Sequence, residues 1–336
     1  MNFHEKRRQQ FLSERTYQEL LRIREETAAY FAIHPFGSGE SDLHRHSLAR
    51  RSVAHDLMEI LTVRYTAGEA IEPLRDELER VVVAYERYGE LLWQWTKDRN
   101  EPVFQFFDLD EYCQLMQIIG LCFLLHRRDL LPRIAALQDG EGGNANGGSD
   151  VIYEEFMIHV FGAEKRFATE HACQIRPYEN LFYALTEDTP AKQLKELDLF
   201  LKRWYKDLAG TGWHDSHKPD ENGNQGGYYG YWSFEAGAAV LLLNIEDDSS
   251  LHKYLYYPKD LVAWARANSH LADSKSAAES GRVEGGKPCP EDGFWFTPAQ
   301  SRSRRYFKAG DIMPAASGDY GGTIWQWDTD QEPPKL

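Results

Sequence analysis

Apolar side chains recur every three or four residues along most of the first 267 residues, which is the spacing of one buried face of an α-helix. Together with N-cap residues and with glycine or proline at segment ends, this periodicity predicts helices at about residues 16–34, 41–65, 70–95, 108–125, 152–161, 178–185 and 189–210. We expect the first to begin at Thr16, because Thr16 and Glu19 have the spacing of a capping box. The pattern therefore predicts a mainly α protein, built as a multi-helix bundle.

A further helix is predicted over residues 234–243, an apolar run that is almost free of charge. The run is too short to span a bilayer, so we expect it to be the most buried helix of the protein. Glu235 is the exception, because a buried carboxylate costs several kcal/mol unless it finds a partner. We expect a core glutamate with a partner, and a catalytic carboxylate is the alternative.

The composition of the chain changes at two places. Residues 138–150 are rich in Gly and Asn but lack the glycine spacing of a phosphate-binding loop, which predicts a flexible connector. Residues 268–287 are rich in Ser, Ala, Gly and Glu, and beyond them the alternation over 324–328, with 304–307 as a strand partner, predicts a small C-terminal β module. The expected domains are an N-terminal helical region (1–137), the connector (138–150), a C-terminal helical domain (151–267), a linker (268–287) and the β module (288–336).

Three short segments of the C-terminal helical domain carry a family resemblance. Residues 232–236 (WSFEA), 245–251 (IEDDSSL) and 256–261 (YYPKDL) resemble the C-terminal domain of the PoNi family, immunity proteins that neutralise nuclease toxins delivered between competing bacteria. The resemblance covers about residues 150–265 well and the N-terminal third more loosely. It involves core aromatics and turns and no reactive set, so it implies a toxin-binding protein without enzymatic activity and without a cofactor.

The C-terminal tail carries a second resemblance. Residues 289–298, 303–307 and 320–328 are similar to a module that recurs in polymorphic-toxin and immunity proteins of type VI secretion loci. This resemblance implies interbacterial competition as well. The Trp and Tyr side chains of the tail are expected to form the core of the module, and stacking on a glycan or a nucleotide is the alternative.

The formal net charge of −15 is concentrated in the middle of the chain, where residues 61–269 carry 34 acidic and 21 basic side chains. The electrostatic field of this excess negative charge disfavours binding to DNA, RNA and anionic lipid, and it favours binding to a basic partner. Excess charge that serves only solubility is the competing interpretation. The charge therefore agrees with a partner such as a nuclease, which must present a basic surface to phosphates.

The sequence also indicates a compartment. No apolar run has membrane-spanning length, and the basic N-terminus is not followed by the apolar segment of a signal peptide. The four cysteines are scattered without a CxxC pair, which fits reduced thiols. We expect a cytoplasmic protein that does not bind a membrane, and whether it forms a homodimer is left open.

The long polar loop at residues 213–227 and the acidic turn that follows residue 245 are the predicted contact surface. Long loops within compact domains often carry function, and acidic loops suit a basic partner. The predicted contact residues are Asp215, Asp220, Glu221, Glu246, Asp247 and Asp248, with Tyr228 and Tyr229 as aromatic anchors. We expect them to bind the basic cleft of a cognate toxin, most simply a DNase, and to occlude it.

Two alternatives stay open. A metal-dependent hydrolase would use His214, Asp215 and His217 with Glu235, although these residues lack a helical scaffold and a second ligand cluster. An adaptor that loads a toxin for export would bind it without protecting the cell. We assign no catalytic and no metal-binding residue.

Overall fold

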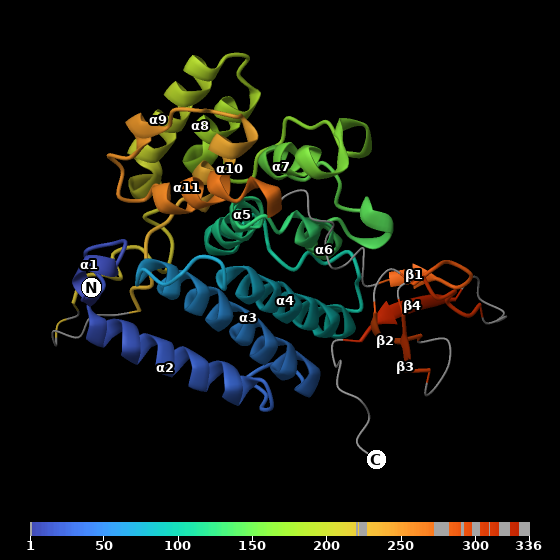
Figure 1. Cartoon of the computed structure of the whole chain (residues 1–336). Coiled ribbons are helices and arrows are strands. Elements are labelled where there is room, and N and C mark those ends of the chain that lie inside the picture. Colours follow the sequence, from blue (N-terminus) through green and yellow to red (C-terminus); the bar gives the residue numbers. More distant parts are fainter. Residues whose placement is uncertain are drawn as a thin grey trace. The chain divides into compact units, whose positions relative to one another are not determined.

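The computed structural model describes residues 2–219, 221, 227–271, 282–289, 292–297, 303–308, 310–315 and 323–328 (Figure 1). The chain divides into two compact units, Met1–Ser269 and His270–Leu336. Within the described residues the first unit contains eleven α-helices, and the second contains a small antiparallel sheet. The predicted fold class, mainly α with a small C-terminal β module, is confirmed.

The first layer of the helical unit consists of α2 (Glu14–Phe31), α3 (Asp42–Thr66) and α4 (Leu74–Thr96), which lie side by side (Figure 1). A short helix, α1 (Phe3–Lys6), precedes them. The predicted start of the first long helix was wrong by one turn, because the side chain of Ser13 accepts the Thr16 amide hydrogen and caps α2. The hydroxyl of Thr16 instead contacts that of Ser13 at 2.7 Å.

The core is centred on α5 (Leu109–Leu124) and α10 (Phe234–Leu242), which pack closely against each other. A Cβ added at Gly120 of α5 would lie 2.6 Å from the carbonyl carbon of Phe234, so only glycine permits this approach. In α10, residues 234–240 are buried as predicted and Leu241 and Leu242 are half-buried, whereas α5 buries a longer run.

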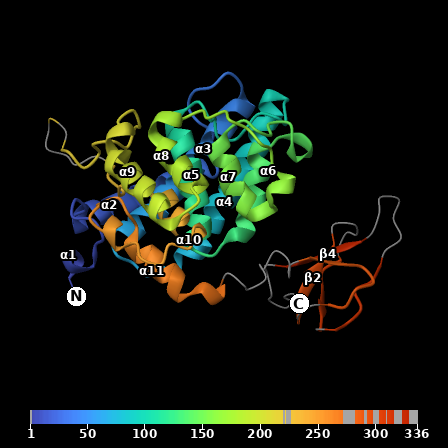
Figure 2. The same ribbon diagram turned by 90° about the horizontal axis from the view of Figure 1, so that it is seen from above.

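The remaining helices cover this pair (Figure 1). They are α6 (Leu131–Gln138), α7 (Val151–Phe161), α8 (Ile175–Thr186), α9 (Pro190–Asp207) and α11 (Lys259–Ala267). In Figure 1 α5 lies between α3 and α4 on one side and α10 and α11 on the other, and Figure 2 places it inside the helical unit. Among the described residues, no helix has both the length and the apolar character needed to cross a membrane.

The Gly- and Asn-rich segment at residues 138–150 lies within the first compact unit and is tied to it by hydrogen bonds. The side-chain amide of Gln138 donates to the Phe104 carbonyl (3.0 Å), and its oxygen accepts the Phe104 amide hydrogen (2.8 Å). Asn146 donates to the carbonyls of Asn100 (2.7 Å) and Gln138 (2.8 Å). These bonds explain how a segment of such low apolar content keeps a defined path.

A buried ion-pair network centred on Arg166 lies beside this segment. Arg166, whose side chain is 4% exposed, binds Asp139 at 2.6 Å and Glu154 at 2.8 Å, and both carboxylates are buried. Tyr153 donates its hydroxyl hydrogen to Asp139 at 2.8 Å. One guanidinium therefore joins the end of the Gly-rich segment to α7.

The second unit is a sheet in the order β1 (Arg282–Glu284), β4 (Ile324–Trp327), β2 (Gly293–Phe296) and β3 (Arg305–Phe307), with antiparallel neighbours. β3 and β4 fall where strands were predicted, but β3 pairs with β2 and not with β4. β1 lies within the segment that was predicted to be a linker, residues 268–287. The buried residues of this unit are Cys289, Trp295, Phe307, Met313 and Trp325. Its tryptophans at 295 and 325 are therefore core side chains, as in the simpler interpretation.

Candidate partner-binding site

The loop after α9 begins with a tightly bonded turn around Asp215. Asp215 has a left-handed backbone (φ 62°), and its carboxylate accepts hydrogen bonds from Lys218 (2.7 Å) and from the Tyr205 hydroxyl (2.7 Å). The bond from Lys218, followed by that from Tyr205, lowers the pKa of Asp215 to about 2. This carboxylate is ionised and partly exposed, but Lys218 already balances its charge.

The two histidines of the loop pack against tyrosines. The ring of His214 stacks on Tyr205 at a centroid distance of 4.2 Å, and Nδ1 of His217 lies 2.8 Å from the Tyr231 hydroxyl. Burial lowers the pKa of His217. Nowhere in the part of the chain that the structure describes do three His, Cys, Asp or Glu side chains converge as metal ligands. Asp220, one of the predicted contact residues, lies outside the described residues.

Glu235, the fourth residue of the hydrolase alternative, is fully buried in α10. Its carboxylate accepts hydrogen bonds from the indole of Trp204 (2.7 Å) and the hydroxyl of Ser233 (2.9 Å). Burial raises the pKa of Glu235 to about 7, against the smaller opposing effect of these bonds. The partner that we expected for this buried carboxylate is therefore present, and it consists of two neutral hydrogen-bond donors.

Besides Asp215, four of the predicted contact residues are accessible. Glu221, Glu246 and Asp247 are exposed, and Tyr229 is half-buried. Asp247 also accepts the backbone hydrogen of Ser249 at 2.9 Å, and its hydrogen bonds with Ser249 lower its pKa. The carboxylate of Asp247 can therefore meet a basic partner in its charged form.

Two predicted contact residues, Tyr228 and Asp248, lie in the interior of the protein and not on its surface. Tyr228 is completely buried and donates its hydroxyl hydrogen to Gln9, so it cannot anchor a partner. Asp248 is 5% exposed and accepts hydrogen bonds from Tyr257 and from Arg266 (2.7 Å for Arg266). Burial alone would raise the pKa of Asp248, but these bonds lower it, which marks an interior ion pair.

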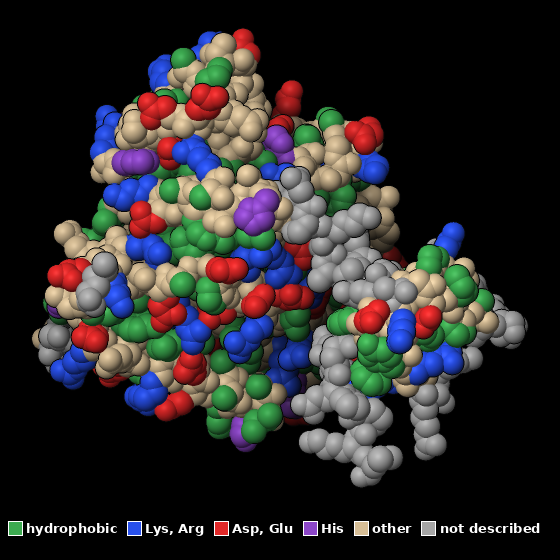
Figure 3. Space-filling model, in the orientation of Figure 1, with side chains coloured by type: hydrophobic (Ala, Val, Ile, Leu, Met, Phe, Trp, Pro, Cys, Tyr) green, Lys and Arg blue, Asp and Glu red, His purple; other side chains and the backbone are tan. Residues whose placement is uncertain are grey.

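Along the chain, the accessible acidic residues precede and follow α10. The chain from Gly227 leads into its first turn, and Glu246 and Asp247 follow its last turn. A helix of nine residues is about 14 Å long, so both ends fit within one ordinary protein interface. On the face shown in Figure 3, acidic and basic side chains are interspersed, so a partner surface has to be argued from particular residues.

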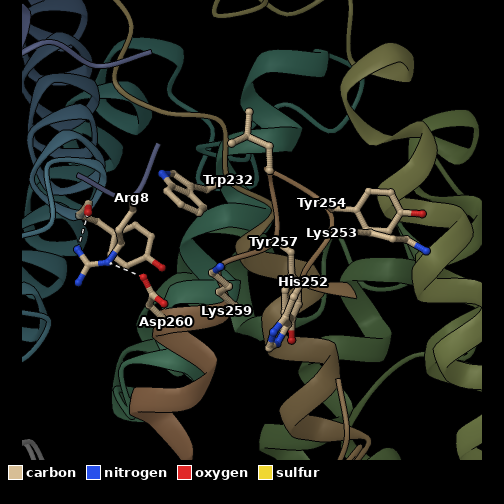
Figure 4. A pocket seen from close by; sticks show the side chains of 10 residues that line it. Arg8, Trp232, His252, Lys253, Tyr254, Tyr257, Lys259 and Asp260 are labelled. Atoms are coloured by element: carbon tan, nitrogen blue, oxygen red, sulfur yellow. Dashed lines mark hydrogen bonds and ion pairs between the residues drawn. The ribbon is translucent and has the colours of Figure 1, made fainter. Parts of the chain in front are cut away.

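Two cavities accompany this surface. One, of about 270 Å³, is drawn in Figure 4, where Arg8 meets Asp260 (3.4 Å) beside Trp232. Lys253, also in its lining, binds Asp198 at 2.6 Å, so much of the positive charge around this cavity is already balanced. The other, of about 470 Å³, is lined by residues of α2, α3 and α5 and by the segments on both sides of the polar loop. Sequence reasoning missed it, because its walls come from residues about 200 positions apart.

The site thus consists of a helical fold with exposed carboxylates in the segments before and after a buried helix. Residues 148–261 match the family model described as "PoNe immunity proteins (PoNi), C-terminal". The resemblance of residues 150–265 to the C-terminal domain of the PoNi family is therefore confirmed over the matched segment.

A solved structure has the same fold. The crystal structure of protein PA2201 from Pseudomonas aeruginosa superposes with a TM-score of 0.60, covering 78% of this chain and 92% of its own, at 18% sequence identity. At that identity the likeness establishes the fold alone. No curated protein matches the chain.

Proposed function

We propose that this protein is a cytoplasmic immunity protein that binds and neutralises a cognate polymorphic toxin, a nuclease effector of a type VI secretion system. The match of residues 148–261 to the PoNi family carries this proposal. The protein acts by binding and not by catalysis. The formal charge of −15 supports a basic partner, because a nuclease presents positive charge to its phosphate substrate.

The proposed contact surface combines charge with one aromatic side chain. Glu221, Glu246 and Asp247 supply exposed negative charge, Asp215 adds a carboxylate that Lys218 partly balances, and Tyr229 offers a half-buried ring. Complementary charge accelerates association and selects the partner, and a buried aromatic anchor then slows dissociation. Occlusion of the basic cleft excludes nucleic acid from it.

The test of the function is co-expression with the toxin encoded next to this gene. Expression of the toxin alone should kill the cells, whereas both proteins together should permit growth and co-purify as a stable complex. A complex that forms while the cells die would favour the adaptor alternative. Survival without a complex would contradict neutralisation by binding.

The contact assignment has its own test. Reversal of Glu246 and Asp247 to Lys should slow association with the toxin about tenfold at low salt and weaken its salt dependence. Reversal of Glu72 and Asp76, which are also exposed, changes the net charge equally and is the matched control. Equal slowing in both double variants, measured by stopped-flow fluorescence, would refute the assignment.

A further inference from the structure

The cavity of about 470 Å³ lies where α2, α3 and α5 meet the two ends of the polar loop. Its walls include Arg24 of α2, Glu59 of α3, Asp110 and Gln117 of α5, and Tyr229. Because Tyr229 is also one of the accessible predicted contact residues, this cavity adjoins the proposed contact surface.

Negative charge exceeds positive charge in these walls. Arg24 is shared between two carboxylates, with Nη1 3.0 Å from Asp56 and Nε 2.6 Å from Glu59. Asp110 is the second carboxylate of the lining, beside Glu59, and its hydrogen-bond donor is the backbone amide of Gly212 at 2.9 Å. Burial, followed by the charges of Arg51 and Arg24, lowers the pKa of His55 to about 4, so this lining histidine stays neutral at pH 7 and adds no positive charge.

Polar side chains in the same walls add hydrogen-bond acceptors. Gln117 is only 8% exposed, and its amide nitrogen lies 3.5 Å from the Trp232 carbonyl and 3.7 Å from the sulfur of Cys113. The side-chain carbonyl oxygen of Gln117 and the hydroxyl oxygen of Tyr229 can each accept a hydrogen bond, and both residues line the cavity. The cavity therefore offers acceptors and negative charge to a group that carries donors and positive charge.

We propose that this cavity receives an arginine side chain of the toxin, an inference that rests on the proposed function. A guanidinium group carries five N–H donors in one plane, which can serve Glu59, Asp110 and Gln117 together, whereas an ammonium is a compact point charge. The rings of Trp213 and Tyr229 in the lining suit a planar cation, which binds over aromatic faces. A basic nuclease surface supplies such a side chain.

The first test uses the whole protein and N-acetyl-L-arginine amide as the probe, followed by NMR. We expect saturable binding, no binding of the neutral isostere N-acetyl-L-citrulline amide, and loss of binding in Glu59→Gln. Failure of the arginine probe to bind, or equal binding of the citrulline or the lysine derivative, would overturn the proposal.

Binding of the probe should also depend on pH. Burial raises the pKa of Glu59 to about 7, against the charge of Arg24, so protons compete with the cation below that pH. The affinity should therefore be about tenfold lower at pH 6 than at pH 8. An affinity that does not change over this range would contradict the role of Glu59.

The second test uses the toxin complex and separates this inference from the proposed function. Glu59→Gln and Asp110→Asn should each raise the Kd for the toxin, by about thirtyfold or more for Glu59, whereas the exposed control Glu72→Gln should leave it unchanged. Far-ultraviolet circular dichroism checks that each variant is folded. Full affinity in both cavity variants would overturn the arginine assignment and leave the immunity function standing. A wild-type protein that does not bind the toxin would overturn both.

Discussion

Substitution of Glu235 by Gln should stabilise the protein, and by an amount that grows with pH. Glu235 is fully buried between Trp204 and Ser233, and one of its carboxylate oxygens has no hydrogen-bond partner among the described residues. Ionisation at this position is opposed by burial and is helped only by neutral donors. Glutamine has the shape of the protonated acid and never ionises, so it isolates the cost of that charge.

The magnitude follows from the pKa. Burial raises the pKa of Glu235 from 4.5 to about 7. Since the folded-state pKa is the higher one, the stabilisation by the proton is complete below the unfolded pKa and is lost as the pH rises through the folded pKa. At about 1.4 kcal/mol for each pKa unit, the cost is near zero at pH 4, about 2 kcal/mol at pH 6 and about 3 kcal/mol at pH 8.

The assay is urea unfolding of wild type and Glu235→Gln at these three pH values, followed by tryptophan fluorescence and circular dichroism. The difference in the free energy of unfolding between the two proteins should follow the calculated curve, because other titrating groups affect both proteins alike. Glu246→Gln is the control, since Glu246 is exposed and should give a small difference at every pH.

A difference that is constant with pH would refute the reasoning, since it would mean that the carboxyl has the same pKa in the folded and the unfolded protein. Destabilisation of Glu235→Gln at pH 8 would refute it too. Such a result would show that the charged form receives more stabilisation from Trp204 and Ser233 than burial removes.

Two further substitutions test the packing of the helical unit by urea unfolding. Gly120→Ala should cost about 1–3 kcal/mol, because the added Cβ would meet the α10 backbone at 2.6 Å, whereas Gly37→Ala, with no atom within 4 Å, should be close to neutral. If Gly120→Ala lost as little unfolding free energy as Gly37→Ala, the close approach of α5 and α10 would be contradicted. Arg166→Ala should cost about 3–5 kcal/mol, because it leaves Asp139 and Glu154 buried without their cation. The control is Arg22, which forms an exposed ion pair with Glu26. Arg22→Ala should cost less than about 1 kcal/mol. Equal effects of the two arginine substitutions would show that the Arg166 network is solvated.

The helices could be predicted because their signals are local. The apolar stripe at residues 78–92 and the cap at Asp108, whose side chain accepts the Glu111 amide hydrogen as expected, lie within one segment each. The start of α2 was misplaced since Ser13 and Thr16 are both good caps, and the local sequence does not decide between them. The strand order of the β module was missed for a related reason, because pairing joins segments that no short-range pattern connects.

The candidate site was predictable only in part. Exposure of Glu246 and Asp247 follows from their place in a polar turn. The burial of Tyr228 and Asp248 depends on Gln9 and Arg266, which are distant in the sequence, and neither residue type signals such a role. The lining residues of the cavity are spread between residues 24 and 229, so no local sequence motif indicates it.

The hydrogen bonds of Gln9 set the earliest point during synthesis at which the helical unit can complete its fold. Its buried side-chain amide donates to the carbonyls of Tyr231 and Leu255, and its oxygen accepts hydrogen bonds from Tyr228 and from the Tyr231 backbone. A ribosome adds about 5–20 residues per second, so about 12 to 50 seconds pass between the synthesis of residue 9 and that of residue 255. The segment around Gln9 is therefore made early but finds its place late. Under the proposed function, a nascent chain that has not reached residue 255 does not yet protect the bacterium.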